Sequence, residues 1–304
     1  MKLSSILNPK FFFRGIPAGD RQSVYKSMLE RAAHEIKQSI DPEKIASEIV
    51  KRENSFSMPY EKGAALPHFR SPEFEDLYII IGIPDTPVLL KENDKAPSQI
   101  IIMSLVSEKT SDTYLKALSA FSRYIIKNNG AVSRFASCKN GDMLNELFDA
   151  ENVALKKELT AEDIMRTDFQ YIGSGSSVAE ALDTFTKYAI LQMPVLDSEK
   201  RLLGVIDSAN ILKKSIPAHY MILDNIKIIS GFEPFQHILN NEDTITVNEY
   251  IREPRGVAEL STPLIQLVLM LVKDESLNIF IVDENKKLVG IVTMTEIVQR
   301  VLRG

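Results

Sequence analysis

The chain has 304 residues, of which 44% are hydrophobic and 25% charged, and its formal net charge at pH 7 is −5. This length exceeds what one hydrophobic core usually serves, so we expect two domains or one domain with a paired repeat, and the negative charge argues against bulk binding of nucleic acid. Because Cys138 is the single cysteine and no apolar run reaches the roughly 20 residues of a membrane-spanning helix, we exclude an intramolecular disulfide and expect a cytoplasmic protein without a membrane span.

Helical and strand patterns alternate in the first half of the chain. Apolar residues at intervals of four predict a helix over residues 20–38, and Asp41, placed before a proline, predicts the N-cap of a second helix. Two β-branched runs, residues 78–83 and 99–106, are too short for core helices and predict buried strands. Helical spacing returns at residues 115–125. These elements together predict a mixed α/β domain.

The second half of the chain contains an internal repeat. Residues 193–206 align with residues 279–292 without a gap, so that Gly204 matches Gly290, 86 residues later. Each copy has the pattern of a strand, a polar turn and a second strand, and each follows an amphipathic helix with its own start signal. Residues 213–242, between the copies, have a helical pattern. Self-similarity of this kind predicts two copies of one structural unit.

The hexapeptide Gly63-Ala64-Ala65-Leu66-Pro67-His68 contains the first candidate site. With Arg52-Glu53 upstream and the opening residues 1–9, it resembles the enzyme IIA proteins of the mannitol/fructose class in the bacterial phosphotransferase system, including their nitrogen-regulatory branch. The resemblance covers residues 1–150 and implies a mixed sheet flanked by helices. It also implies that His68 accepts a phosphoryl group from a phosphohistidine carrier protein.

The residue types suit this chemistry independently of the resemblance. A neutral imidazole is a nucleophile near pH 7 and forms a phosphoramidate that can be passed on. The guanidinium of Arg52 can bind two oxygens of the transferring group, and small residues before His68 would let a partner's active site approach closely. The alternative is that His68 is a structural turn residue in a domain that binds partners without turning over phosphate.

Two departures from the family pattern bear on that choice. Residues 57–59 are Ser-Met-Pro, where the family usually has a Ser/Thr-Thr-Gly stretch. Tyr114 occupies the place of a second family histidine, and its hydroxyl can donate a hydrogen bond but carries no positive charge. The remaining histidines, His34, His219 and His237, have no ligand spacing, and we interpret them as structural.

The repeat resembles a pair of CBS domains, named after cystathionine β-synthase. The residues that carry this resemblance are Asp163-Ile164-Met165, Met193-Pro194-Val195 and the Gly-Val-Ile or Gly-Ile-Val strand that closes each copy. The resemblance implies two repeats of a β-α-β-β-α type, a homodimer, and clefts for an adenosine-type ligand such as AMP, ADP or ATP. The expected segments are a linker over 151–158, a first CBS motif over 159–216, a helical connector over 217–242 and a second motif over 243–304.

Adenylate-binding members of this family typically have the pattern Gly-x-x-Thr/Ser-x-x-Asp, which both copies vary. The candidate ligand-binding residues are Gly290, Ile291, Thr293 and Glu296 in the second copy, and Asp207 and Asn210 in the first. Glu296 is long enough to reach a ribose, whereas Asp207 replaces a hydroxyl and would repel phosphate. Thr293 and Glu296 fit a helix capping box equally well. Arg252 and Arg255 are candidates to supply positive charge to the ligand, but we interpret them as residues of a solvated turn.

These patterns lead to one functional hypothesis and one alternative. We predict that a ligand of the CBS pair, bound at its second half, changes the geometry of the pair and biases phosphorylation or partner binding at His68. No cofactor is required, and the expected partners are a phosphohistidine carrier and a transporter or regulatory target. The alternative is a non-catalytic regulator in which a degenerate enzyme IIA-like domain binds partners and the CBS pair only dimerises.

Overall fold

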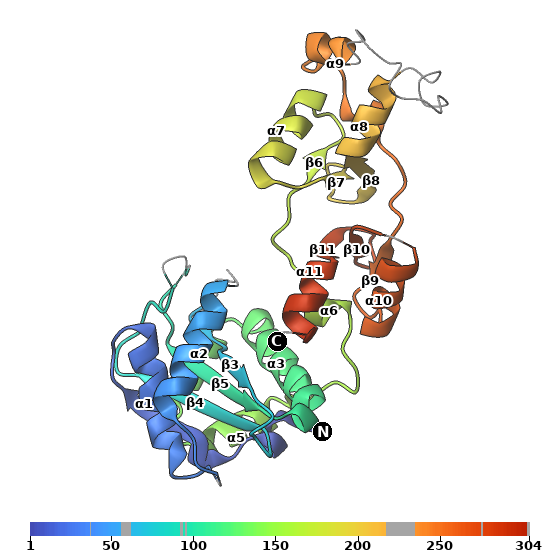
Figure 1. The fold of residues 1–304 in the computed structure, drawn as a ribbon. Helices are drawn as coiled ribbons and strands as arrows, with labels where there is room; N and C mark the ends of the chain where they lie inside the picture. The colour runs from blue at the N-terminus through green and yellow to red at the C-terminus, as the bar shows by residue number, and fades with distance from the viewer. Residues whose placement is uncertain are drawn as a thin grey trace. The chain divides into compact units, whose positions relative to one another are not determined.

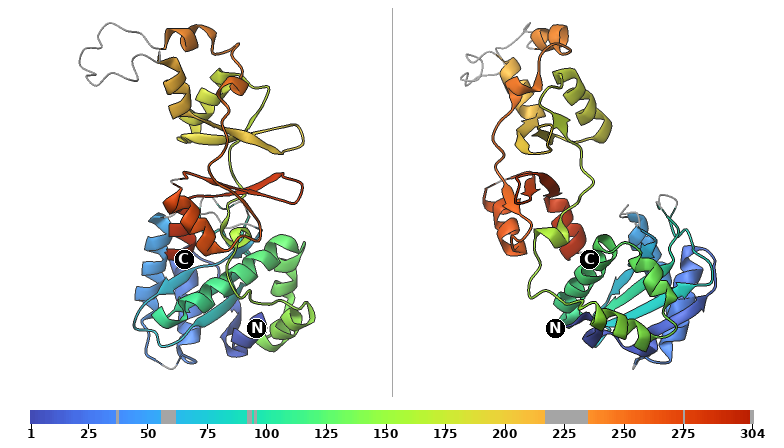
Figure 2. Two further views of the ribbon diagram at one scale, coloured as in Figure 1. Left: turned by 90° about the vertical axis from the view of Figure 1, so that its right-hand side faces the viewer. Right: turned by 180° about the vertical axis from the view of Figure 1, so that it is seen from behind.

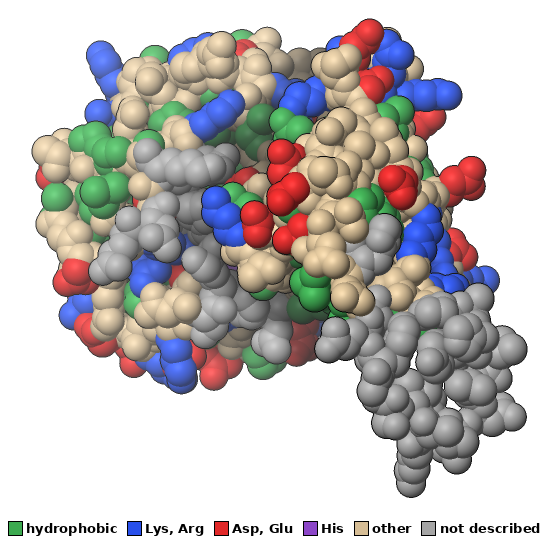
Figure 3. Space-filling view, turned by 90° about the horizontal axis from the view of Figure 1, so that it is seen from above, with side chains coloured by type: hydrophobic (Ala, Val, Ile, Leu, Met, Phe, Trp, Pro, Cys, Tyr) green, Lys and Arg blue, Asp and Glu red, His purple; other side chains and the backbone are tan. Residues whose placement is uncertain are grey.

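The computed structural model describes residues 1–36, 38–55, 62–91, 94, 96–216, 235–274 and 276–302. The chain forms two compact units, Met1–Leu159 and a second unit that begins at Thr160 (Figure 1). Within the described ranges, no helix is both long enough and apolar enough to cross a bilayer. Acidic and basic side chains are interspersed among the described residues of the face shown in Figure 3, in keeping with the small net charge.

The N-terminal unit is built on one mixed sheet, as expected. Its strands are β1 Phe12–Ile16, β2 Ala64–Ala65, β3 His68–Arg70, β4 Tyr78–Pro84 and β5 Ile100–Val106. The order is β1-β4-β5-β2, and β3 also pairs with β5, so β2 and β3 share one edge. Strands β4 and β5 are antiparallel to each other, and the other pairs are parallel. Every residue of these two central strands is buried, which explains their continuous apolar runs.

Helices cover both faces of this sheet. They are α1 Arg21–Ala33, α2 Pro42–Ser55, α3 Ser111–Lys127, α4 Ala131–Ser137 and α5 Gly141–Ala150. Alternate residues of the central strands point to opposite faces, so Ile80 and Met103 pack with α1 and α2, whereas Ile81 and Ile102 pack with α3, α4 and α5. The predicted cap of α2 is confirmed, because Asp41 Oδ1 accepts a hydrogen bond of 3.1 Å from the Lys44 amide.

The second unit contains two three-stranded sheets, β6-β7-β8 and β9-β10-β11. The strands are β6 Ile172–Gly173, β7 Gln192–Leu196, β8 Leu202–Asp207, β9 Val257–Glu259, β10 Ile279–Val282 and β11 Leu288–Val292. The helices are α6 Ala161–Ile164, α7 Val178–Tyr188, α8 Ser208–Ser215, α9 Gln236–Asn241, α10 Leu264–Lys273 and α11 Met294–Ile297, with a further turn at Val298–Leu302. Of the predicted helical connector, residues 217–234 lie outside the described residues.

The two copies of the repeat are joined through the segments that precede strands β6 and β9, which we call the crossed linkers. Arg166 and Ile291 exchange two backbone hydrogen bonds of 3.0 Å, and Arg252 and Val205, each 86 positions from its counterpart, exchange bonds of 2.9 and 3.0 Å. The two sheets face each other in Figure 2, with an apolar cluster between them that includes Leu196, Phe280 and Leu288. Each linker therefore completes the sheet of the opposite copy.

Candidate functional site

His68 is the first residue of the edge strand β3, and its position is fixed by backbone contacts. It pairs with Ser104 of β5, whose amide donates a hydrogen bond of 2.9 Å to the carbonyl oxygen of Pro67. Gly63 turns the chain into β2 with a φ of 77°, a conformation that glycine adopts without strain. The imidazole is partly exposed at this edge. Edge placement lets a partner protein approach the ring.

The small residues before His68 do not serve the purpose that we expected. Ala64 and Ala65 are 3% and 0% exposed, and their side chains pack into the two cores on opposite faces of the sheet. The idea that they keep a surface open for a partner is therefore wrong for both. Their size is explained by packing, since the strand that carries them is covered on each side.

Tyr114 lies directly against His68. The centroids of the two rings are 5.4 Å apart, and the ring planes are tilted by 36°. Tyr114 stands in the first turn of α3 and is 1% exposed. Its hydroxyl is buried and has no hydrogen-bond partner among the described residues. The tyrosine that stands at the sequence position of the expected second histidine thus lies against His68.

Two guanidinium groups act on the same phenol. Burial raises the pKa of Tyr114, and the positive charges of Arg70 and Arg52 oppose that rise. Arg52 lies in the last turn of α2, beside Glu53, which accepts hydrogen bonds from Arg21 at 3.3 Å and from the Tyr25 hydroxyl at 3.2 Å. These contacts fix the end of α2. The positive charge of Arg52 therefore acts on Tyr114, whose ring lies 5.4 Å from that of His68.

Sequence reasoning missed Arg70. A strand over residues 68–70 was not predicted, because three residues are too few to show an alternating pattern. Had that strand been recognised, residues i and i+2 would share one face, which would have put Arg70 on the side of His68. Of the other sequence expectations, residues 57–59 and His219 lie outside the described residues, as does the side chain of His237. His34 is exposed at the end of α1.

Residues of both CBS copies line a cleft of about 210 Å³. Its polar lining consists of Gln192, Asp207, Ser208, Arg252, Arg255 and Asn278. Asn278 Nδ2 donates a hydrogen bond of 2.9 Å to Gln192 Oε1, which joins equivalent positions of the two copies. Two guanidinium groups and two amides in one cleft can bind an anionic group.

Asp207 is held inside this cleft by groups of the same unit. It is 6% exposed and is the N-cap of α8, where its Oδ1 accepts a hydrogen bond of 2.8 Å from the Asn210 amide. Its Oδ2 accepts a hydrogen bond from Arg252 Nε. The Asn210 side chain donates to the carbonyl oxygen of Tyr250 at 2.9 Å. The interpretation of Arg252 as a solvated turn residue was therefore wrong, because the residue pairs with a buried carboxylate 45 positions away.

The predicted ligand residues of the second copy also have internal contacts. Thr293 and Glu296 form a reciprocal capping box on α11, with 2.9 Å between the Thr293 amide and Glu296 Oε2. The other oxygen of Glu296 lies 3.8 Å from Arg166 Nε. A Cβ on Gly290 would lie 2.4 Å from Met165 Sδ, so close packing explains this glycine. Ile291 is 3% exposed and pairs with Arg166.

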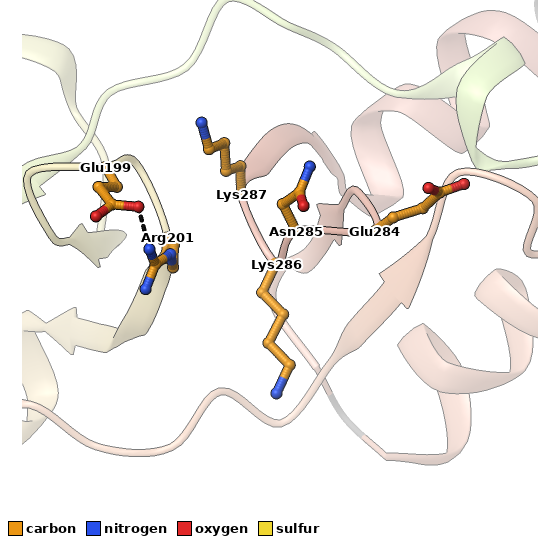
Figure 4. Close-up of a pocket in the computed structure, with 6 residues that line it drawn as sticks. All are labelled: Glu199, Arg201, Glu284, Asn285, Lys286 and Lys287. Carbon is orange, nitrogen blue, oxygen red and sulfur yellow. Dashed lines mark hydrogen bonds and ion pairs between the residues drawn. The ribbon is translucent and has the colours of Figure 1, made fainter.

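A second hollow, of about 540 Å³, lies between the two hairpin turns of the repeat (Figure 4). It is lined by Glu199, Arg201, Glu284, Asn285, Lys286 and Lys287. Arg201 pairs with Glu199, and the side chains of Lys286 and Lys287 point in opposite directions. These exposed charges do not converge on one point. Among the described residues, no cluster of His, Cys, Asp and Glu could hold a metal ion.

Comparison with known families agrees with this arrangement. Residues 5–151 match the family model of the phosphoenolpyruvate-dependent sugar phosphotransferase system, EIIA 2. Residues 161–216 and 247–303 match the CBS domain model. The chain therefore contains an EIIA type 2 domain followed by a CBS pair.

Individual relatives are distant. The nitrogen regulatory protein of Pseudomonas aeruginosa is 26% identical over 118 residues, which cover 39% of this chain and 76% of that protein. Chloride channel protein D of Dictyostelium discoideum is 21% identical over 155 residues, 50% of this chain but only 15% of that protein.

Similar solved structures contain CBS domains. A CBS domain-containing protein from Bacillus anthracis has 20% identity and a TM-score of 0.38, with 48% of this chain and 94% of that chain covered. The CBS-pair protein CBSX2 from Arabidopsis thaliana has 21% identity and a TM-score of 0.38, with 48% and 96% covered.

Proposed function

We propose that the chain, with its EIIA type 2 domain and CBS pair, is a cytoplasmic regulatory phosphocarrier of the mannitol/fructose class, close to the nitrogen-regulatory branch. His68 accepts a phosphoryl group from a phosphohistidine carrier protein and passes it to, or signals it to, a transporter or regulatory target. The observation that carries this proposal is the partly exposed imidazole of His68, packed against Tyr114, on which the charges of Arg52 and Arg70 act.

The chemistry follows from that grouping. A ring nitrogen of His68 attacks the phosphorus of the carrier's phosphohistidine; the carrier's P–N bond breaks as the new one forms. The departing imidazole takes up a proton, and His68 loses the proton on its other ring nitrogen. Because this transfer depends on positioning and on stabilisation of the oxygen charge, the two guanidinium groups are the principal aids that the domain supplies.

The CBS pair supplies the regulation in this proposal. An adenosine-type nucleotide such as AMP, ADP or ATP binds in the cleft that both copies line, where Arg255 attracts its phosphate and the amides of Gln192 and Asn278 offer hydrogen bonds. A ligand with different affinities for two arrangements of the pair biases phosphorylation or partner binding at His68. We choose this cleft over the candidate residues of the second copy because Gln192, Arg255 and Asn278 line one cavity.

Label transfer tests the phosphocarrier role. The full chain is incubated with a radiolabelled, phosphorylated histidine carrier protein, and acid-labile, base-stable label is measured. We expect label on the wild type and on His34→Ala, the control in an exposed helix end, and none on His68→Ala. An unlabelled wild-type chain would overturn the proposal.

Thermal shift tests the nucleotide role. A ligand at a hundred times its dissociation constant adds about 2.7 kcal/mol to the stability of the state that binds it. We expect AMP, ADP or ATP to raise the melting temperature of the wild type, and a smaller rise with Arg255→Ala. Absence of any shift across the three nucleotides would leave the CBS pair as a structural element.

The second candidate function is a partner-binding regulator without phosphoryl transfer, and Tyr114 in place of the second histidine favours it. In that case the CBS pair serves as the predicted homodimer contact. The exposed side chains of Ile265, Leu269 and Val272, which follow one face of α10, support such a contact. Analytical sedimentation tests this contact by comparing the molecular mass of Leu269→Glu with that of the wild type. If both proteins have the mass of a dimer, the contact does not lie on this face of α10.

A further inference from the structure

One buried polar atom beside the proposed nucleophile, the Tyr114 hydroxyl, has no hydrogen-bond partner among the described residues. Buried hydroxyls in native proteins are almost always hydrogen-bonded, because leaving one unpaired forfeits its contacts with water. The Tyr114 hydroxyl breaks this rule among the described residues, although the side chain is 1% exposed. Phenylalanine would fill the same space without that cost. The hydroxyl therefore points to a partner outside the described residues.

The surroundings of the hydroxyl indicate the charge of that partner. Arg70 and Arg52 both act on the phenol, so a visiting group meets positive potential there. The tyrosine ring lies 5.4 Å from the imidazole of His68, centre to centre. A group that accepts a hydrogen bond from the hydroxyl would lie close to the histidine. An anionic oxygen fits this position, and a cation does not.

We propose that the Tyr114 hydroxyl donates a hydrogen bond to a phosphoryl oxygen during transfer to His68. This inference rests on the proposed phosphocarrier function and assigns one of its oxygen contacts. The hydroxyl keeps its proton throughout, while the P–N bond to the carrier breaks and the P–N bond to His68 forms. Arg52 and Arg70 supply the positive charge that a second imidazole would otherwise supply, and Tyr114 supplies a neutral donor.

Tyr114 is buried on a helix whose following turns belong to the core, so the donor is positioned before the phosphoryl group arrives. Ala117 and Phe121, one and two turns further along α3, are each 1% exposed and belong to the core on that face of the sheet. A donor fixed in this way needs no reorganisation when the charge develops. Burial raises the pKa of the phenol, so the hydroxyl remains protonated through the range where an imidazole loses its charge.

Two conservative substitutions in the same helix separate this role from a structural one. Tyr114→Phe removes the unpaired hydroxyl, and Tyr124→Phe removes a hydroxyl that donates to Glu151 and accepts from Arg134 at 3.2 Å. We expect Tyr114→Phe to keep or raise the melting temperature and to slow labelling of His68 about 100-fold, with the KM for the carrier unchanged. Tyr124→Phe should lower the melting temperature and leave the rate unchanged.

The outcomes distinguish the two proposals. If the wild type takes up label and Tyr114→Phe takes it up at the same rate, or changes only the KM, the hydrogen bond is refuted and the phosphocarrier role stands. If the wild type takes up no label, the phosphocarrier role itself fails.

Discussion

Tyr114 and Asp207 are both positions at which the chain departs from a family pattern, one in each compact unit. Asp207 has a charged carboxylate where the pattern has a hydroxyl. This carboxylate accepts hydrogen bonds from Arg252 and from the amide of Asn210. Tyr114 has a hydroxyl where the pattern has an imidazole, and that hydroxyl has no hydrogen-bond partner among the described residues. A departure that is paired internally serves stability, whereas one left unpaired beside a nucleophile is available to a substrate.

The largest expected effect tests the site around Tyr114. Arg52→Ala and Arg70→Ala should each slow phosphoryl transfer to His68 about 100-fold, because each removes a charge that stabilises the transferring group. Rapid-quench label transfer measures the rate. Lys51→Ala removes a positive charge from the same turn of α2, where Lys51 lies 3.8 Å from Glu48, and should have little effect. Equal rates in all three variants would mean that the site is not prepared for a phosphoryl group.

The next effect tests the internally paired charge of Asp207. Arg252→Met leaves that carboxylate, whose side chain is 8% exposed, without its cation, and should lower the free energy of unfolding by about 2–3 kcal/mol. Urea denaturation measures the loss. The matched control is Arg166→Met at the equivalent position, where 3.8 Å separates the charges and Glu296 keeps its capping contacts. We expect less than about 1 kcal/mol there.

If Arg252→Met and Arg166→Met lower the free energy of unfolding equally, the first copy does not depend more on its ion pair than the second copy does. A double variant sharpens the test further. Asp207→Asn keeps an oxygen that can cap α8 and removes the charge, so adding it to Arg252→Met should restore part of the stability.

Whether a feature of the fold or the site could be predicted from the sequence depends on how far apart in the chain its residues lie. Local patterns predicted the strands β4 and β5, the cap of α2 at Asp41 and the repeat, since each is written in neighbouring residues. The candidate histidine came from a short motif, and the structure places its ring against that of Tyr114.

The missed features are long-range ones. Strand β1 was not predicted, and its partner β4 lies more than 60 residues later in the chain. The pair between Asp207 and Arg252 spans 45 positions, and no sequence period connects the two. Arg70 escaped because its strand has only three residues. Contacts of this kind depend on the fold and cannot be recognised in one sequence before the fold is known.

A third prediction compares equivalent glycines of the two copies. A Cβ on Gly204 would lie 2.8 Å from the backbone oxygen of Arg252, whereas a Cβ on Gly290 meets the side chain of Met165. Since backbone yields less easily than a methionine, Gly204→Ala should cost about 3 kcal/mol and Gly290→Ala about 1 kcal/mol. Denaturant unfolding of both variants measures the difference. A larger loss at Gly290 would contradict the packing described for the linkers.

The smallest effect concerns pH. Burial raises the pKa of Tyr114 above its ordinary value of 10.0, so at high pH the unfolded chain releases this proton and the folded chain retains it. Stability is therefore lost as the pH rises above about 10, by up to about 1.4 kcal/mol per pH unit from this residue. Unfolding of Tyr114→Phe at pH 9 to about 11 should show a shallower decline than the wild type. Identical slopes would contradict burial of the hydroxyl in the folded state.

The crossed linkers of the second unit have a consequence for how the chain can be dissected. Arg166 precedes strand β6 of the first copy yet bonds to β11, the last strand of the second, and Arg252 precedes β9 of the second copy yet bonds to β8, the last strand of the first. Excising either copy would remove a strand segment from the copy that remains. We therefore expect residues 160–302 to melt in one cooperative step, with neither half recoverable as a folded fragment.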